Sequence, residues 1–304
     1  SLDAAGNLAE VGQMQQMMGR EGQIVLVNGQ LRPQLRAAPG ERERWRIINA
    51  CPSRYLRLGL DGQQLRLLSR DLGRLPVPED VTEVVLAPGN RVELLVETRD
   101  GSSTLTAAPV DRGSMDAMMG GAMGGDNQSG GGPVDLLTLA VSGSAGTDPV
   151  PVPEGRPLRD LRNEPVTAAR TLDFAMGMNA NMSGGMGMGM GSGQGTMMAF
   201  TINGRKFDPE RVDETAAAGT VEEWTLTNSS PMDHPIHLHV WPMQIVQDGD
   251  RDVTRPQWQD VVNVPARSQV KVRVAFDDFA GRTVFHCHIL DHEDQGMMAT
   301  VQAR

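Results

Sequence analysis

Residues 234–239 read His-Pro-Ile-His-Leu-His, and residues 286–297 read His-Cys-His-Ile-Leu-Asp-His-Glu-Asp-Gln-Gly-Met. The chain has 304 residues and six histidines, and every histidine falls in these two strings. Imidazole, thiolate and thioether groups together make copper sites in proteins. The two strings therefore predict a copper centre in the C-terminal part of the chain.

Side-chain alternation predicts one all-imidazole cluster. Successive side chains of a strand point to opposite faces, so histidines two residues apart share a face. This applies to His-Leu-His in the first string and to His-Cys-His in the second, if each lies on a strand. Placing the two strings side by side predicts a cluster of four imidazoles, which are His237, His239, His286 and His288.

The thiolate of Cys287 is expected on the opposite face of its strand. His234, an odd number of residues before His237, tends to that same side, and the loop after the second strand can return His292 and Met297 to it. Two imidazoles, one thiolate and a weak axial thioether form the ligand set of blue-copper electron-transfer sites. Because the neighbours of Cys287 belong to the imidazole cluster, an electron accepted there would have a short covalent route between the two clusters.

Other metals fit the strings less well. A lone His-x-His pair also occurs in zinc sites and in cupin-like iron sites. Zinc does not require a cysteine flanked by two histidines on a strand, with a methionine ten residues further on. Eight candidate ligands in order and at workable spacing favour copper.

The pattern His-Pro-x-His-x-His followed by His-Cys-His-x3-His-x4-Met resembles the C-terminal copper motifs of multicopper oxidases, the laccase-like enzymes. The resemblance extends over most of the chain, although the motifs cover only its last third. It implies copper as cofactor and dioxygen as electron acceptor. The ligands it implies are His234, Cys287, His292 and axial Met297 for a type 1 copper, His237 for a type 2 copper, and His239, His286 and His288 for a type 3 pair. Glu293 resembles the acidic residue that relays protons in this family, although it could instead only orient a ligand.

An internal repeat predicts two domains of the same fold. Asn-Gly at residues 28 and 203 is followed in each half by the pattern Gly-x4-Trp-x3-Asn-x2-Pro, at 40–52 and 219–231. Short alternating segments separated by turn residues are typical of strands. We therefore expect an all-β chain of two Greek-key β-sandwiches, which the resemblance makes cupredoxin-like. The expected boundaries are 1–143 for a copper-free domain, 144–165 for an extended linker, and 166–304 for the copper-binding domain.

The first half of the chain contains no histidine. An ungapped alignment of the repeats places Tyr55, Leu58 and Leu60 where the second half has the three histidines of residues 234–239. We expect these apolar residues to fill the core of the first sandwich.

The number of imidazoles departs from the family pattern. Four imidazoles cannot fully ligate three coppers. Three-domain multicopper oxidases resemble this chain with an additional N-terminal cupredoxin domain, which carries two further His-x-His pairs. We expect the chain to be the middle and last domains of a longer enzyme, with the missing N-terminal domain as its partner, and the chain alone can be inactive.

Two Met/Gly-rich inserts, 114–132 and 176–198, together hold twelve of the nineteen methionines. The methionines alternate with Gly, Ser and Asn, so we expect mobile surface loops rather than packed structure. Thioethers are soft ligands that favour Cu(I), which suggests copper gathering. Similar inserts occur in the copper-tolerance branch of the family, which oxidises cuprous ion; a tolerated low-complexity insertion is the alternative.

Charge and cysteine content limit the remaining possibilities. The net charge is −10, and no basic cluster indicates nucleic-acid binding. No apolar run is long enough to span a membrane. No signal peptide is visible, and periplasmic or extracellular residence follows from the resemblance alone. Cys51 and Cys287 could pair as a disulfide, but the neighbours of Cys287 favour metal binding.

The function that these observations favour is one-electron oxidation of Cu(I), or of small phenols and aromatic amines, at the Cys287 copper. The resemblance couples this to the four-electron reduction of dioxygen to water. Two alternatives stay open, namely a mononuclear blue-copper electron-transfer protein and a Met-rich copper-sequestering protein.

Overall fold

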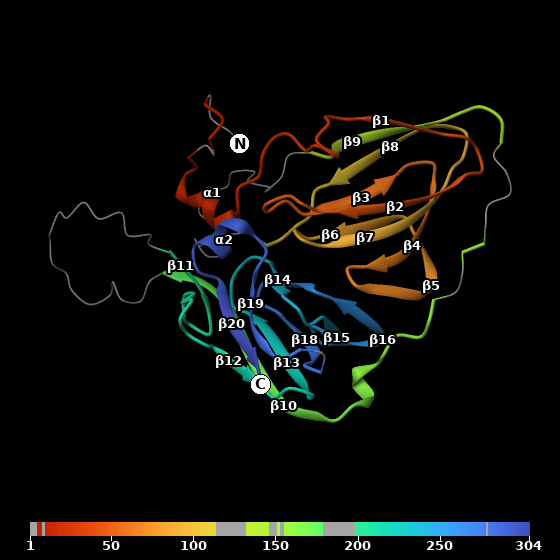
Figure 1. Ribbon diagram of the computed structural model, residues 1–304. Coiled ribbons are helices and arrows are strands. Elements are labelled where there is room, and N and C mark those ends of the chain that lie inside the picture. The colour runs from red at the N-terminus through yellow and green to blue at the C-terminus, as the bar shows by residue number, and fades with distance from the viewer. Residues whose placement is uncertain are drawn as a thin grey trace.

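The structure is a computed structural model that describes residues 5–7, 10–113, 132–145, 151–152, 155–178, 198–277 and 279–304. The fold is all-β and consists of two cupredoxin-like β-sandwiches, one above the other in Figure 1. Two short α-helices, α1 (Gln13–Met18) and α2 (Leu290–Asp294), lie side by side on the same flank of the molecule. No helix in the described ranges has the length and apolarity needed to span a membrane.

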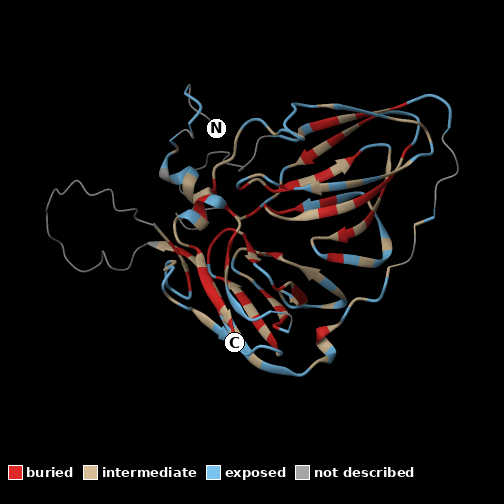
Figure 2. Ribbon diagram, viewed as in Figure 1, coloured by how far each residue is buried: buried red, intermediate tan, exposed pale blue. Residues whose placement is uncertain are grey.

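Within the described residues, the first sandwich has a five-stranded sheet in the order β1-β9-β8-β3-β6 and a four-stranded sheet in the order β2-β7-β4-β5. The strands are β1 (Gln34–Ala37), β2 (Arg42–Ile48), β3 (Leu56–Leu60), β4 (Gln64–Arg70), β5 (Gly73–Val81), β6 (Glu83–Leu86), β7 (Arg91–Glu97), β8 (Gly101–Ala108) and β9 (Val134–Val141). Alternate residues of these strands point inward, which Figure 2 shows as buried bands separated by less buried ones.

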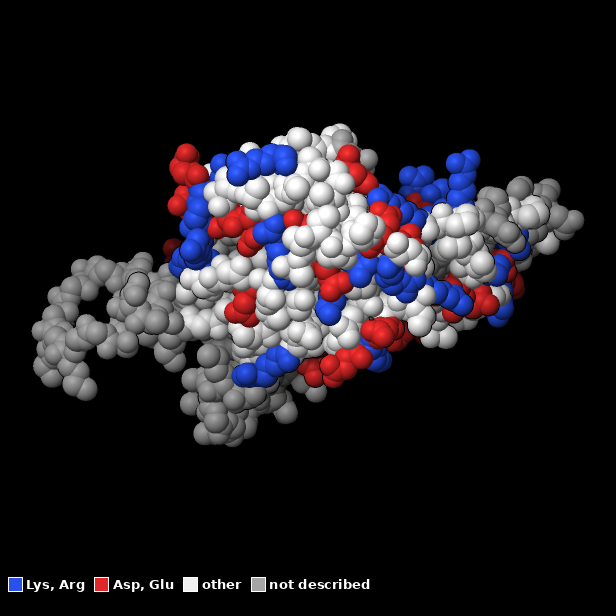
Figure 3. Space-filling model, turned by 90° about the horizontal axis from the view of Figure 1, so that it is seen from below, with Lys and Arg blue, Asp and Glu red and all other residues white. Residues whose placement is uncertain are grey.

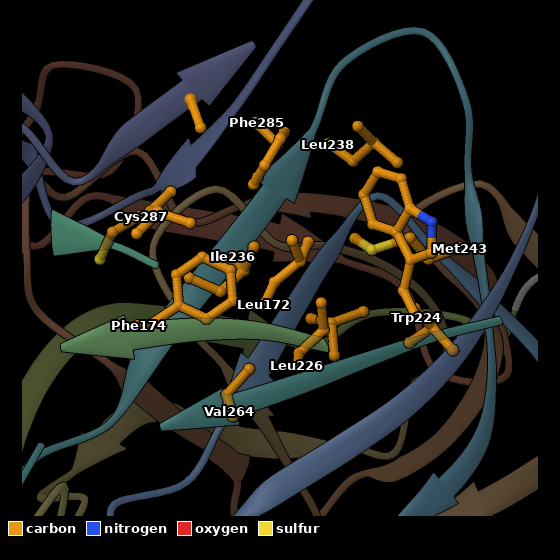
Figure 4. Packing of buried hydrophobic residues seen from close by; sticks show 14 of the residues in the cluster. Leu172, Phe174, Trp224, Leu226, Ile236, Leu238, Met243, Val264, Phe285 and Cys287 are labelled. Carbon is orange, nitrogen blue, oxygen red and sulfur yellow. The ribbon is translucent and has the colours of Figure 1, made fainter. Parts of the chain in front are cut away.

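The second sandwich, again within the described residues, pairs a sheet of order β11-β10-β13-β18-β15-β16 with one of order β12-β20-β19-β14-β17. The strands are β10 (Val166–Met178), β11 (Met198–Ile202), β12 (Glu214–Ala216), β13 (Val221–Asn228), β14 (His234–Leu238), β15 (Met243–Asp248), β16 (Arg251–Gln259), β17 (Val261–Val264), β18 (Gln269–Ala275), β19 (Gly281–Cys287) and β20 (Met298–Ala303). In Figure 4, Cys287 lies at one side of the apolar core, with Trp224 and Met243 at the other.

The two sandwiches repeat each other in detail. Both Asn-Gly pairs have positive φ at both residues, 50° and 77° at Asn28-Gly29 and 51° and 73° at Asn203-Gly204, as type I′ turns require. In each half the tryptophan of the repeat donates its indole N–H to the glutamate two residues before it. These shared features support the repeat predicted from the sequence.

The register of β3 and β14 differs from the ungapped alignment. Leu56 pairs with Leu86, and His234 pairs with Val264. The backbone carbonyls of Leu86 and Val264 each accept a hydrogen bond from the side chain of the repeat's asparagine, which is Asn49 in the first half and Asn228 in the second. Leu56, and not Tyr55, therefore occupies the position of His234.

The cause is a loop that is one residue longer in the first half. The side chain of Asn49 reaches a carbonyl five residues further on, whereas Asn228 reaches one four residues further on. Gly59 and Asp61 consequently occupy the positions of the two later histidines of the string, so the prediction for Leu58 and Leu60 was wrong in register. Both leucines are nevertheless buried in the core, as expected.

The second Met-rich insert was placed too broadly. Residues 176–178 end β10 and Met198 begins β11, where the two strands pair in antiparallel register. The Met176 side chain is buried in the core of the second sandwich, so it fills core there instead of lying in a loop. The other methionines of the two inserts lie outside the described residues, and these are Met115, Met118, Met119, Met123, Met182, Met186, Met188, Met190 and Met197.

The expected linker is not extended throughout. Its last residues form a 3-10 helix, Leu161–Asn163, and the fully buried Leu161 side chain packs with Val221 and Ala275. The backbone N–H of Leu161 also donates to the Gln244 side chain. This end of the linker is therefore part of the second sandwich.

Acidic and basic side chains are interspersed on the face of the molecule seen in Figure 3. Many charged side chains of the described residues lie in ion pairs, for example Arg42 with Glu97 and Arg44 with Glu93. Opposite charges of these pairs therefore compensate each other locally.

Candidate metal centres

The structure brings one thiol and two imidazoles together at the end of the second sandwich. His234 begins β14, Cys287 ends β19, and His292 lies in α2. The Cys287 Sγ atom lies 3.5 Å from the Nδ1 atom of His234 and 3.6 Å from that of His292, and the two Nδ1 atoms are 3.2 Å apart. All three side chains are fully buried. Both cysteines of the chain are free thiols.

Hydrogen bonds at the far side of each ring aim the Nδ1 atoms at the sulfur. The Nε2 atom of His234 lies 3.0 Å from the Ser230 hydroxyl, and that of His292 lies 2.9 Å from the Met17 carbonyl oxygen. A carbonyl only accepts, so Nε2 of His292 carries the proton and Nδ1 is left with a lone pair. Metal-binding histidines are oriented by partners of this kind.

The Met297 backbone is tied to the same group. The Cys287 N–H donates to the Met297 carbonyl at 3.0 Å, and the Met297 N–H donates to the His292 carbonyl at 2.9 Å. The Met297 side chain is fully buried in the apolar cluster that contains Cys287. The soft sulfur and imidazole donors that meet here fit copper.

Burial keeps this cluster uncharged when no metal is bound. It lowers the pKa of His292 to about 4, lowers that of His234 well below its usual value, and raises that of the Cys287 thiol. The charge of Arg112 adds to the lowering at both imidazoles. A metal ion must therefore displace the thiol proton when it binds.

The second cluster contains the four remaining histidines. The Nε2 atoms of His239 and His286 are 3.1 Å apart, and one ring nitrogen of His237 lies within 4.8 Å of the same group. The ring of His288 is centred 5.7 Å from those of His237 and His286. The structure thus brings together the four imidazoles that the alternation of side chains along the strands predicted to lie on one face.

Hydrogen bonds at the ring nitrogens of His237 and His286 orient this cluster. The Nδ1 atom of His237 lies 2.7 Å from the Asp260 carbonyl oxygen, which leaves Nε2 free. The Nδ1 atom of His286 lies 3.1 Å from a carboxylate oxygen of Glu293. Burial alone would raise the pKa of Glu293, but the hydrogen bond to His286 and the other imidazoles outweigh it, so that pKa lies below its usual value. Glu293 is thus placed to orient His286; proton relay stays a prediction.

The first sandwich contributes residues to this cluster that the sequence did not reveal. Arg91 forms a two-pronged ion pair with Asp260, whose carbonyl oxygen contacts His237. The Asn90 side chain donates to the Val261 carbonyl at 2.9 Å. Gly89 lies directly against the His288 ring. These contacts join segments about 170 to 200 positions apart, so local patterns could not predict them.

The metal-free protein is expected to lose stability as the pH falls from about 6.5 to about 4. His292 and His237 have folded pKa values of about 4, whereas the unfolded chain binds protons near 6.5. The unfolded state therefore takes up more protons in this window, and folding weakens by roughly 3 kcal/mol for the fully buried His292. Urea unfolding of metal-free protein at pH 7.5 and pH 4.5 measures this. A His292→Gln variant should show a smaller difference, and equal stability at both pH values would contradict the expectation.

Two sandwiches with a Cys/His/His cluster beside a four-histidine cluster define a copper protein of the cupredoxin class. Two family profiles, each described as "Multicopper oxidase", match residues 4–109 and 181–304. The chain belongs to the multicopper oxidase family, whose members use copper as cofactor.

Individual relatives show the extent of the similarity. A laccase of Bacillus subtilis is 27% identical over 302 residues, which cover 91% of this chain and 53% of that protein. The cell division protein FtsP of Aggregatibacter aphrophilus is 29% identical over 266 residues, covering 85% and 51%. The solved structure of a multicopper oxidase from Campylobacter jejuni, described as a metallo-oxidase, superposes with a TM-score of 0.74 at 29% identity, covering 98% of this chain and 59% of that one. The chain thus spans about half the length of the curated relatives it matches.

Proposed function

We propose that the chain contains the electron-accepting site and half of the oxygen-reducing site of a multicopper oxidase. His234, Cys287 and His292, with Met297 as axial ligand, would hold a type 1 copper. His237 would serve a type 2 copper, and His239, His286 and His288 a type 3 pair. The convergence of the Cys287 sulfur with two imidazole nitrogens in a fully buried site is the observation that carries the proposal.

Copper in these sites would supply one-electron chemistry. The protein's part is to exclude water and to hold the donor atoms in place. Complete burial of the three-residue cluster does the first, and the hydrogen bonds of Ser230 and Met17 to the ring nitrogens do the second. A site held in one geometry loses little energy to rearrangement when an electron arrives.

Residues 286–288 connect the two clusters, and we assign this segment to electron transfer between them. Cys287 belongs to one cluster, and both of its sequence neighbours belong to the other. The connection is covalent and only one residue long in either direction. Glu293, hydrogen-bonded to His286, lies where it could deliver protons to the second cluster.

The second cluster needs further ligands for a three-copper site. We propose that an additional cupredoxin domain with two His-x-His pairs supplies them, in line with the fraction of its relatives that this chain spans. The proposed electron donors are Cu(I) or small phenols and aromatic amines, and dioxygen is the proposed acceptor. The metallo-oxidase and laccase names of the relatives support both donor classes. A periplasmic or extracellular location accompanies this assignment.

The test is anaerobic loading with copper, followed by addition of Cu(I) or a phenol and measurement of oxygen uptake. The chain should be assayed alone and together with an N-terminal cupredoxin domain that carries the missing His-x-His pairs. Oxygen uptake that depends on that domain supports the proposal. No uptake with either donor in the reconstituted protein would reject it.

A mononuclear electron-transfer protein is the second candidate, because among the described residues His234, Cys287 and His292 already bring together the two imidazoles and the thiolate of a blue-copper set. Copper stoichiometry and the visible spectrum separate the two. One blue copper and no further metal in the reconstituted protein would indicate electron transfer alone. The Met-rich sequestration hypothesis predicts that deleting residues 177–195 abolishes Cu(I) uptake while the blue absorption persists.

A further inference from the structure

Arg112 is a buried cation that the proposed mechanism does not use. It follows β8 in the first sandwich, and only 2% of its side chain is exposed. Burying a guanidinium is costly unless its donors are satisfied and its charge is compensated. The surroundings of Arg112 must therefore compensate its charge and satisfy its N–H donors.

The guanidinium is held by three acceptors and an aromatic ring. It donates to the carbonyls of Ser53 at 3.0 Å and Met18 at 3.2 Å, and to the Glu21 carboxylate at 3.0 Å. Its Cζ atom lies 5.3 Å from the centroid of the Tyr55 ring. The position of the charge is thus fixed on every side.

The same residue borders the thiolate cluster through its neighbours. The Arg112 carbonyl accepts a hydrogen bond of 2.8 Å from the Asp233 N–H, and Asp233 directly precedes His234. The Met18 carbonyl that Arg112 contacts follows the Met17 carbonyl that contacts His292. Arg112 therefore lies next to the backbone segments that hold both imidazoles.

A fixed positive charge beside a copper ion favours the reduced ion, which carries one positive charge less. Because both the cation and the cluster are buried, water screens this interaction less than it would at the surface. Glu21 opposes the effect, since its carboxylate pairs with Arg112 and also with Arg54. The two residues act on the copper with opposite sign.

We propose that Arg112 raises the reduction potential of the copper held by His234, Cys287 and His292, and that Glu21 sets how far it is raised. The proposal rests on the type 1 site described under Proposed function. The first sandwich would then take a direct part in selecting electron donors, because a copper ion with a higher reduction potential accepts electrons from weaker reductants.

The experiment is a redox titration of the blue absorption in the copper-loaded chain. Arg112→Gln should lower the potential, with about a tenfold shift toward Cu(II) at a fixed solution potential, which is about 59 mV for one electron. Arg112→Lys keeps the charge and should shift it less. Glu21→Gln should shift the potential in the opposite direction, upward. Arg44→Gln, which removes a surface arginine of the same sandwich, should leave it unchanged.

The outcomes separate this inference from the copper assignment. Absence of blue absorption in the unaltered copper-loaded chain would reject the type 1 site itself. Blue absorption with equal shifts for Arg112→Gln and Arg112→Lys, or with no shift for Arg112→Gln, would overturn the electrostatic role. If Arg112→Gln does not fold, Glu21→Gln decides the question, because a potential that stays constant or falls would contradict the proposal.

Discussion

Cys287→Ser is expected to abolish the blue absorption of the copper-loaded chain. The sulfur is the soft donor at which two imidazole nitrogens converge, and a serine hydroxyl supplies neither its softness nor its charge. Visible spectroscopy with copper analysis measures the change. Because the hydroxyl is buried, we also expect the metal-free variant to be about 1–3 kcal/mol less stable.

Cys51→Ser is the matched control, since Cys51 is the other cysteine of the chain and lies in the first sandwich. It should keep the full absorption. An intense blue band that survives Cys287→Ser, or disappears in Cys51→Ser, would contradict the assignment of the thiolate ligand.

Gly89→Ala is expected to destabilise the protein and to disturb the imidazole cluster. Gly89 has a φ of +83°, and a Cβ atom there would lie 2.5–2.8 Å from three atoms of the His288 ring. The positive φ costs an alanine about 1–2 kcal/mol. Displacing the ring, or opening the contact between the sandwiches, adds about 1–3 kcal/mol as for other overpacked sites. Urea unfolding measures the sum.

Gly40→Ala separates the two contributions. Gly40 has a φ of +79°, and nothing lies within 4 Å of a Cβ atom built on it. The variant should therefore lose only the backbone part. Equal losses for Gly40→Ala and Gly89→Ala would show that the His288 contact does not matter.

The second half of the repeat supports the same reading of Gly89. Arg267 occupies the corresponding turn position and has a φ of +52°, so this turn tolerates a side chain. The glycine in the first half is thus explained by the ring of His288, and not by backbone conformation alone. Comparison of the two repeats is the sequence signal that could have pointed to Gly89.

Strand parity explains why the sequence predicted both clusters. Whether two residues share a face depends only on an odd or even separation, which the chain itself displays. The same reasoning failed at Leu58, because one additional loop residue shifts every later position to the opposite face. The length of a loop cannot be deduced from a periodic sequence pattern. The one-residue shift in register was therefore visible only in the pairing of β3 with β6.

Contacts between distant segments were beyond prediction. Arg91 with Asp260, and Arg112 with Glu21 and Met18, depend on how the sandwiches and the first helix pack together. No local propensity encodes that packing. The helix α1 itself, six residues long, precedes the first sandwich in sequence but lies against α2 of the second.

The hydrogen bond between the Met17 carbonyl and His292 joins residues 275 positions apart. Residue 17 emerges from the ribosome long before residue 292 is synthesised. This hydrogen bond can therefore form only after both sandwiches have been synthesised. During most of translation the segment around α1 therefore lacks its contact with His292. If the thiolate cluster binds copper as proposed, the His292 ring would reach its final orientation only after both sandwiches have been synthesised.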